Sequence, residues 1–107
     1  MSTPTLPKAV EDFVTTTNTH DGDALFTLFA PVATVTDDGT TYADATAIRE
    51  WITLHQVNPK IVITPVSFDA GRLVGSVDGE FPGGPLTFAF TFVIEDDRIA
   101  ELAIGPA

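Results

Sequence analysis

The chain has 107 residues and no cysteine. Disulfides, thiolate nucleophiles and cysteine-ligated zinc or iron–sulfur sites are therefore excluded, because each of them needs a thiol. No apolar run approaches the roughly 20 residues of a membrane-spanning helix, and the first residues lack the charged head and apolar run of a signal peptide. We therefore expect a cytoplasmic protein that does not bind a membrane.

Positive charge is also scarce, with five Lys and Arg against 15 Asp and Glu and a formal net charge of -10. The five cations are scattered along the chain, whereas a surface that follows nucleic-acid phosphates needs them clustered. Nucleic acid is thus excluded as an expected partner. An acidic surface also repels anions, which favours a neutral or apolar small molecule as the ligand.

The chain is rich in apolar residues, which make up 44% of the sequence and include eight Phe. This is enough material for one hydrophobic core, and the length suits a single domain that covers residues 1–107. A separate cofactor-binding module has no room in such a chain, and we expect no cofactor.

Apolar residues at helical spacing predict helices early in the chain. The first covers residues 6–17, and the second covers residues 24–29 and ends at Pro31.

A third helix begins after Asp44, a residue type that caps helix N-termini, and ends near residues 58–59. Its apolar stripe includes Trp51, and His55 follows Trp51 by one turn on the same inward stripe. Tyr42 lies in the loop just before this helix.

The remaining segments have strand character. A short strand ends at Asp37, before the turn signal Asp38-Gly39. The second half of the chain contains strand-like runs separated by hairpin signals at residues 61–68, 73–79, 86–94 and 99–104. Helices followed by antiparallel strands predict an α+β fold with the helices packed on one face of a curved sheet.

Phe88, Phe90 and Phe92 alternate along one predicted strand and therefore share one of its faces. Two interpretations remain open, since this face can fill the core under the helices or line a hydrophobic cavity. The candidate pocket-lining residues are aromatic: Phe13, Phe29, Trp51, Phe88, Phe90 and Phe92.

Several segments together resemble one known family. They are residues 18–30 (NTHDGDALFTLFA), 33–35 (ATV), 38–39 (DG), 47–51 (AIREW), 79–85 (GEFPGGP) and 97–99 (DRI). In order and spacing this pattern is similar to the SnoaL-like group of the nuclear transport factor 2-like superfamily. The resemblance implies a cone of three N-terminal helices on a strongly curved, mainly antiparallel sheet, an apolar cavity and often a homodimer. It implies no single activity, because this superfamily includes isomerases, cyclases, dehydratases, epoxide hydrolases and non-enzymes.

The comparison with ketosteroid isomerase, a member of this superfamily, can be made residue by residue. The resemblance places Asp37 at the position of the catalytic base, Phe13 at the position of an oxyanion-hole Tyr and Phe90 near that of a protonated acid. Neither Phe can donate a hydrogen bond to a developing enolate. Ketosteroid isomerisation is therefore disfavoured.

Asp37 is the best candidate for a general base, since a carboxylate that apolar walls desolvate becomes a stronger base. The alternative is an exposed turn in which Asp37 and Asp38 cap local amides. His55 and Tyr42 are candidates for assisting groups, as a proton relay and as a hydroxyl at the cavity mouth. Their alternatives are a half-buried His at a helix end and a Tyr that packs over the loop.

No metal site is expected, because the two His are far apart in the sequence and no calcium-loop spacing occurs. Three functional hypotheses follow. The first is a cofactor-free isomerase, cyclase or lyase for a small hydrophobic molecule, with Asp37 as general base. The second is a non-catalytic protein that binds an apolar small molecule, and the third is a dimerisation module without a ligand.

Overall fold

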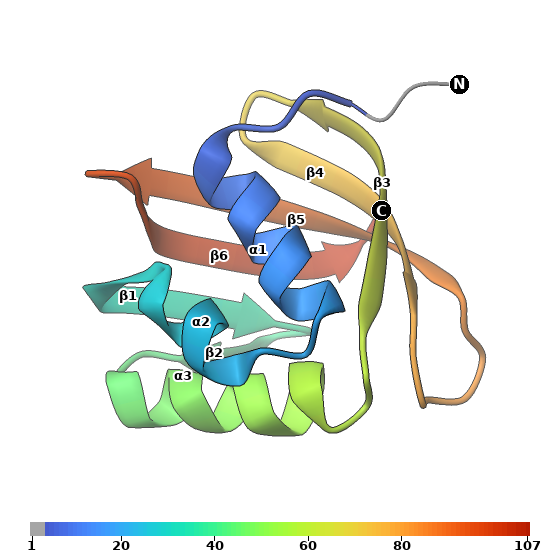
Figure 1. Ribbon diagram of the computed structural model, residues 1–107, viewed down its shortest axis with the longest axis horizontal. Helices are drawn as coiled ribbons and strands as arrows, with labels where there is room; N and C mark the ends of the chain where they lie inside the picture. Colours follow the sequence, from blue (N-terminus) through green and yellow to red (C-terminus); the bar gives the residue numbers. More distant parts are fainter. Residues whose placement is uncertain (1–3) are drawn as a thin grey trace.

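The computed structural model describes residues 4–107, which form one six-stranded sheet covered by helices (Figure 1). The elements in chain order are α1 (Lys8–Asn18), α2 (Gly22–Thr27), β1 (Phe29–Asp37), β2 (Thr40–Tyr42), α3 (Ala45–Ile52), the π-helical turn η1 (Thr53–Val57), β3 (Val62–Asp69), β4 (Arg72–Asp78), β5 (Leu86–Glu95) and β6 (Arg98–Pro106). Among residues 4–107, no helix is both long and apolar enough to cross a bilayer.

The strand order in the sheet is β2-β1-β6-β5-β4-β3. All neighbouring strands are antiparallel except β1 and β6, which run parallel. Figure 1 shows α1 and α2 lying over one face, α3 along the β1–β2 side, and β3 turning across the direction of β1 and β6. The sheet is thus strongly curved, and the predicted α+β cone is confirmed.

Side-chain caps begin two of the three helices, and the sequence predicted the one at Asp44. The Ala24 amide donates to Asp21 Oδ1 at 3.1 Å, and the Ala47 amide donates to Asp44 Oδ1 at 2.8 Å. Each carboxylate satisfies an amide that has no partner within its helix and interacts favourably with the positive end of the helix dipole.

The end of α2 differs from the prediction. The helix stops at Thr27 and β1 begins at Phe29, so the prediction that the helix reaches residue 29 and ends at Pro31 is wrong. Pro31 lies within β1, where the register with β6 shifts between Phe29 and Thr34. Such an irregularity accommodates a residue that has no amide hydrogen for the sheet.

The segment after β1 also differs, because the predicted loop that carries Tyr42 contains the short strand β2. Asp38 and Gly39 have positive φ values of 50° and 84° and form the turn between β1 and β2. This left-handed pair is the kind that closes a tight hairpin, so the expected turn starts a strand pairing.

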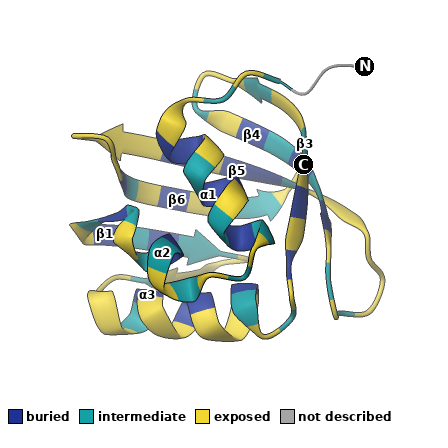
Figure 2. Cartoon of the chain, in the orientation of Figure 1, coloured by how far each residue is buried: buried dark blue, intermediate teal, exposed yellow. Residues whose placement is uncertain are grey.

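The core lies between the three helices and the inner face of the sheet. Phe13 is fully buried, with its ring centroid 5.9 Å from that of Phe90 and 5.3 Å from that of Phe92. Figure 2 shows buried residues on the side of α1 that faces the strands and at alternating positions along the strands. The tilted and edge-on ring geometries are those that aromatic pairs prefer.

The corner between α1 and α2 is tied to the edge strand β3. The Asn18 side chain donates through Nδ2 to the Ile63 carbonyl at 2.9 Å, and its Oδ1 accepts from the Ile63 amide at 2.7 Å. Nearby, His20 Nε2 lies 3.2 Å from the Ile61 carbonyl. Asn18 thereby takes the place of a neighbouring strand, covers part of the sheet edge and holds the cone closed on this side.

Candidate functional site

A cavity of about 230 Å³ lies between η1 and the inner face of the sheet. Its wall combines a polar group of residues with a larger apolar group. The polar residues are Asp37, His55 and Gln56, and the apolar residues are Pro59, Ile61, Val77, Phe81, Leu86, Phe88, Phe90 and Ile104.

Asp37, the last residue of β1, is held in place by the only Trp of the chain. The buried Trp51 on α3 donates its indole Nε1–H to Asp37 Oδ2 at 2.9 Å. A buried indole N–H needs an acceptor, and an anionic oxygen is a strong one. The indole engages Oδ2, and no side-chain hydrogen bond within the described residues engages the other carboxylate oxygen, Oδ1.

The π-helical turn changes which side chain faces inward after Trp51. The Asn58 amide donates to the Thr53 carbonyl, five residues earlier, at 3.0 Å. In such a turn each hydrogen bond spans five residues instead of four, so the helix turns less per residue and the side chains after Trp51 are displaced around its axis. Gln56 is therefore buried and His55 is exposed, so the prediction that His55 lies on the inward stripe is wrong. His55 still contributes to the cavity wall.

Gln56 is a site residue that the sequence interpretation missed. Its side chain is only 6% exposed, and its Oε1 atom is buried with no hydrogen-bond partner in the described chain. The backbone, in contrast, is anchored, because the Gln56 carbonyl accepts from the Ile61 amide at 3.1 Å. A spacing of four residues from Trp51, as in an α-helix, selects the neighbouring residue His55. The sequence would have pointed to Gln56 only if the π-turn had been known.

Tyr42 and His55 lie together at the outer side of this polar group. Tyr42 Oη is 3.5 Å from His55 Nε2, and the two ring centroids are 6.3 Å apart. Tyr42 is the last residue of β2, is half-buried, and also packs against Trp51 with centroids 6.5 Å apart. The predicted trio of Asp37, His55 and Tyr42 is thus linked through contacts, although Tyr42 itself is not part of the cavity wall.

The six candidate pocket-lining aromatics divide into two groups. Phe88 and Phe90 line the cavity. The other four are buried in the hydrophobic core: Phe13, Phe29, Trp51 and Phe92. Within that core, Phe29 packs edge-on against Trp51 at a centroid distance of 6.4 Å, and so supports the residue that holds Asp37.

In the described part of the chain, the cavity wall carries negative charge without a Lys or Arg to balance it. The wall holds the Asp37 carboxylate and no Lys or Arg side chain from the described residues. Within residues 4–107, no three His, Asp or Glu side chains cluster in a way that could hold a metal ion. An anionic ligand would meet repulsion without a compensating cation, which favours a neutral ligand.

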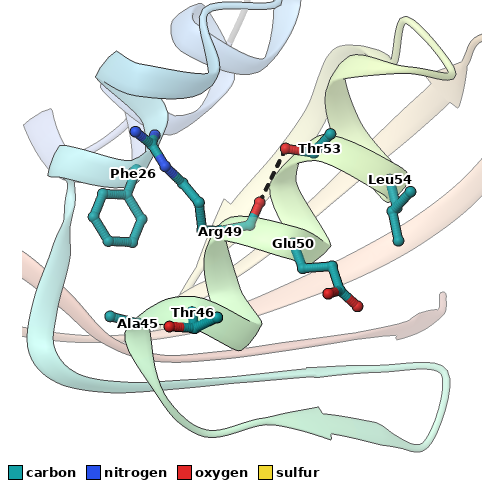
Figure 3. A pocket seen from close by; sticks show the side chains of 7 residues that line it. All are labelled: Phe26, Ala45, Thr46, Arg49, Glu50, Thr53 and Leu54. Carbon is teal, nitrogen blue, oxygen red and sulfur yellow. Dashed lines mark hydrogen bonds between the residues drawn. The ribbon is translucent and has the colours of Figure 1, made fainter.

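A second hollow is an open groove on the outer side of α3, with a volume of about 610 Å³. Figure 3 shows Arg49 reaching from α3 toward α2 and Phe26, while Glu50 and Leu54 extend along the outside of the helix. Arg49 pairs with Asp23 at 2.8 Å, and its guanidinium carbon lies 4.7 Å from the centre of the Phe26 ring. The Arg49 guanidinium thus already pairs with a carboxylate. The groove also lacks a group of reactive side chains like that around Asp37.

Comparisons with known proteins place this geometry in context. No protein-family model and no curated protein matches the sequence. A candidate polyketide cyclase from Sinorhizobium meliloti is 34% identical, with a TM-score of 0.83 and coverage of 94% of this chain and 95% of that chain. The epoxide hydrolase/cyclase-like enzyme SalBIII, described in pyran ring formation in the polyether salinomycin, is 18% identical, with a TM-score of 0.81 and coverage of 91% and 86%.

The orange carotenoid protein of Anabaena, solved with canthaxanthin, is 16% identical, with a TM-score of 0.80. The match covers 97% of this chain and 36% of that longer one. Identities this low show a common fold, whereas the match at 34% identity extends over nearly the whole of both chains. The chain therefore belongs to the SnoaL-like proteins of the nuclear transport factor 2-like superfamily.

Proposed function

We propose that the protein is a cofactor-free enzyme that moves a proton on a small, neutral, largely apolar molecule, as isomerases, cyclases and lyases do. The observation that carries this proposal is the position of Asp37. Its carboxylate lies in the wall of an apolar cavity, and a buried indole N–H holds one of its oxygens. A general base needs such a fixed geometry and an environment that excludes much of the water.

The proposed step begins when an Asp37 oxygen takes a proton from a carbon next to a carbonyl group. The C–H electron pair forms the new carbon–carbon double bond, and the carbonyl π pair moves onto oxygen to give an enolate. Where a carbon–carbon double bond adjoins that carbon, the product is a dienolate, and return of the proton to its far carbon completes an isomerisation. Where the enolate carbon instead attacks a second carbonyl carbon of the same molecule, a ring closes, the second carbonyl's π pair moves onto its oxygen, and that oxygen takes the proton from Asp37. The Trp51 hydrogen bond orients the carboxylate for this transfer.

His55 and Tyr42 are proposed as assisting groups. His55 contributes to the cavity wall, and its Nε2 lies 3.5 Å from the Tyr42 hydroxyl. An imidazole at this place can relay the abstracted proton toward solvent or back to the ligand.

The relatives support a reaction of this class. The protein from Sinorhizobium meliloti is a candidate polyketide cyclase, and SalBIII is described in pyran ring formation. Ring closures of this kind depend on proton transfers that a positioned carboxylate can perform.

The test is a proton-exchange assay with 2-tetralone, a neutral bicyclic ketone whose α-protons are acidic enough to exchange. In D₂O, we expect the wild-type protein to accelerate α-deuteration, measured by NMR, and Asp37→Asn to lower that acceleration by about 100-fold or more. Asn keeps an oxygen that can accept from Trp51 but is not a base. Asp38→Asn is the matched control, because Asp38 is exposed and outside the cavity wall, and should retain full activity. Equal rates for Asp37→Asn and the wild type would reject the base assignment.

A non-catalytic binding protein is the alternative, and one specific observation favours it. The two positions that would supply the oxyanion hole in ketosteroid isomerase hold Phe13 and Phe90, which donate no hydrogen bond. The alternative predicts saturable binding of 2-tetralone with no acceleration of exchange. A dimerisation module without a ligand would neither bind 2-tetralone nor accelerate its exchange. The cavity volume of about 230 Å³ agrees with this third possibility, because drug-sized ligand sites begin at roughly 300 Å³.

A homodimer through the sheet is part of the same proposal. Val62 and Val66 on β3 and Val93 on β5 are exposed by 41%, 60% and 40%, so strands of the sheet present apolar surface to solvent. Burial of these side chains against a second copy would stabilise a dimer. Sedimentation velocity should show a dimer for the wild type and a monomer for Val66→Glu, and a monomeric wild type would contradict this interface.

A further inference from the structure

Gln56 is the most unusual polar residue of the described chain. Its Oε1 is one of only two buried side-chain polar atoms in residues 4–107 that have no hydrogen-bond partner, and the other is Thr17 Oγ1. A buried polar atom without a partner costs free energy, because folding removes the water that it would otherwise bind. Most buried polar atoms in proteins are paired for this reason. Of these two residues, Gln56 lines the cavity and Thr17 does not.

The placement of Gln56 depends on the π-turn. A regular α-helix would turn a different residue inward after Trp51, whereas η1 brings Gln56 into the wall that also holds Asp37. The turn therefore places a side-chain amide in the cavity wall, with its Oε1 unpartnered and out of reach of solvent.

We propose that Gln56 is a specificity-determining residue that hydrogen-bonds an oxygen function on the ligand, in the form of a neutral enol or phenol hydroxyl. This inference rests on the proposed function of the cavity and names the feature of the ligand that the cavity selects. Rotation about the last side-chain bond exchanges the amide oxygen and the NH₂ group at low cost. A hydroxyl both donates and accepts, so it satisfies either orientation of the amide.

The remaining cavity wall agrees with a ligand of this kind. Apart from Asp37, His55 and Gln56, the wall consists of aliphatic and aromatic side chains. The ligand would place its oxygen near the polar residues and its hydrocarbon body against Phe88 and Phe90. In the proposed reaction, the same amide would bind the oxygen on which the enolate charge develops, a role that Gln side chains can fill.

The test uses an isosteric pair of probes, 2-naphthol and 2-methylnaphthalene, which differ by a hydroxyl in place of a methyl group. The 2-naphthol hydroxyl resembles the enol form of 2-tetralone. We expect the wild type to bind 2-naphthol about 3–10-fold more tightly than 2-methylnaphthalene, the range of one neutral hydrogen bond. In Gln56→Leu this ratio should fall to about 1 or below, measured by titration under NMR.

A second readout needs no ligand. If Gln56 is retained for recognition at a cost in stability, Gln56→Leu should raise the Tm of the free protein by about 4–8 °C. A Gln that supports the fold would instead give a lower Tm on substitution. Gln56→Met, which is unbranched, repeats both measurements without a change of branching in the π-turn.

Thr17→Val is the matched control, because it removes the other unpartnered buried polar atom at a place outside the cavity wall. It should also raise the Tm, but it should leave the binding ratio unchanged.

The outcomes separate this inference from the proposed function. A hydroxyl preference that persists in Gln56→Leu and disappears in Asp37→Asn would overturn the role of Gln56 while leaving the cavity as a ligand site. Equal binding of both probes by the wild type would do the same. Failure of both probes to bind would reject the ligand site itself, and the inference with it.

Discussion

The two ends of the cone have opposite character. At one end, Phe13 on α1 packs against Phe92 on β5 in a closed hydrocarbon core, and Phe90, which also touches Phe13, lies between this core and the cavity. At the other end, the sheet and η1 leave a cavity with Asp37 and Gln56 in its wall. The closed end contributes stability through burial of apolar surface. The open end holds a half-buried carboxylate and an unpaired amide, which are unfavourable for stability and useful for chemistry.

The cavity and the closed core thus share one short chain, and burial of apolar surface in the core stabilises the cone around the cavity. At the two positions that the resemblance matches to the hydrogen-bond donors of ketosteroid isomerase, this chain has Phe13 and Phe90, whose side chains are hydrocarbon. Phe13 is fully buried. The polar groups of the cavity come instead from the end of β1 and from η1.

The largest expected effect comes from truncation at the closed end. Phe13→Ala should lower the free energy of unfolding by about 3–5 kcal/mol, because it removes a fully buried ring and leaves a cavity. Phe88→Ala should cost clearly less, since Phe88 is half-buried and already borders the cavity. Urea denaturation of the two variants gives the comparison. Equal losses would contradict the division into a closed and an open end.

An intermediate effect is expected at the junction of the two ends. Trp51→Phe keeps an aromatic ring but removes the N–H that binds Asp37, and should lower the free energy of unfolding by about 1.5–3 kcal/mol. The control is Tyr42→Phe, which removes only a hydroxyl at 3.5 Å from His55 and should cost no more than about 0.5 kcal/mol. Thermal denaturation of both variants measures the difference. A Trp51→Phe protein as stable as Tyr42→Phe would show that the Asp37 hydrogen bond contributes little.

The smallest effect is expected on the exposed side of α1, near its start. The hydrogen bond and charge of Asp12, 3.0 Å from Lys8 Nζ, raise the pKa of Lys8 above its usual value. A raised pKa in the folded state means that the pair stabilises the fold at neutral pH and loses this effect only as the pH rises past the Lys8 pKa, above about 10.4. Because the pair is exposed, Lys8→Met should leave the Tm at pH 7 nearly unchanged. A drop of several degrees would contradict this view.

The sequence was sufficient for most of the fold. The helix-capping carboxylate at Asp44 and the alternating apolar residues in the second half indicate local structure directly. The prediction was wrong where tertiary pairing decides the outcome. Residues 29–31 join β1 because β6 offers hydrogen bonds at Phe29, and residues 40–42 form β2 because a left-handed turn folds them back onto β1.

The candidate site was less accessible to sequence reasoning. Asp37 stood out because it ends a strand, but its hydrogen bond with Trp51 joins residues 14 positions apart and depends on how α3 packs. Gln56 could not be identified, since helical periodicity after Trp51 points to His55 and a single π-turn has no clear sequence signal. The positions of Phe88 and Phe90 were open to two interpretations, and only the shape of the cavity separates them from Phe92.

The most direct test of a ligand site at Asp37 uses the single Trp of the chain, whose indole gives one signal in a ¹H–¹⁵N spectrum. Because Trp51 Nε1–H donates to Asp37 Oδ2, a ligand that meets this carboxylate must change the indole environment. During titration with 2-tetralone, we expect the indole signal to shift and saturate in the wild type and in Asp38→Asn. An indole signal that stays fixed while 2-tetralone binds and shifts other resonances would place the ligand elsewhere and contradict the account.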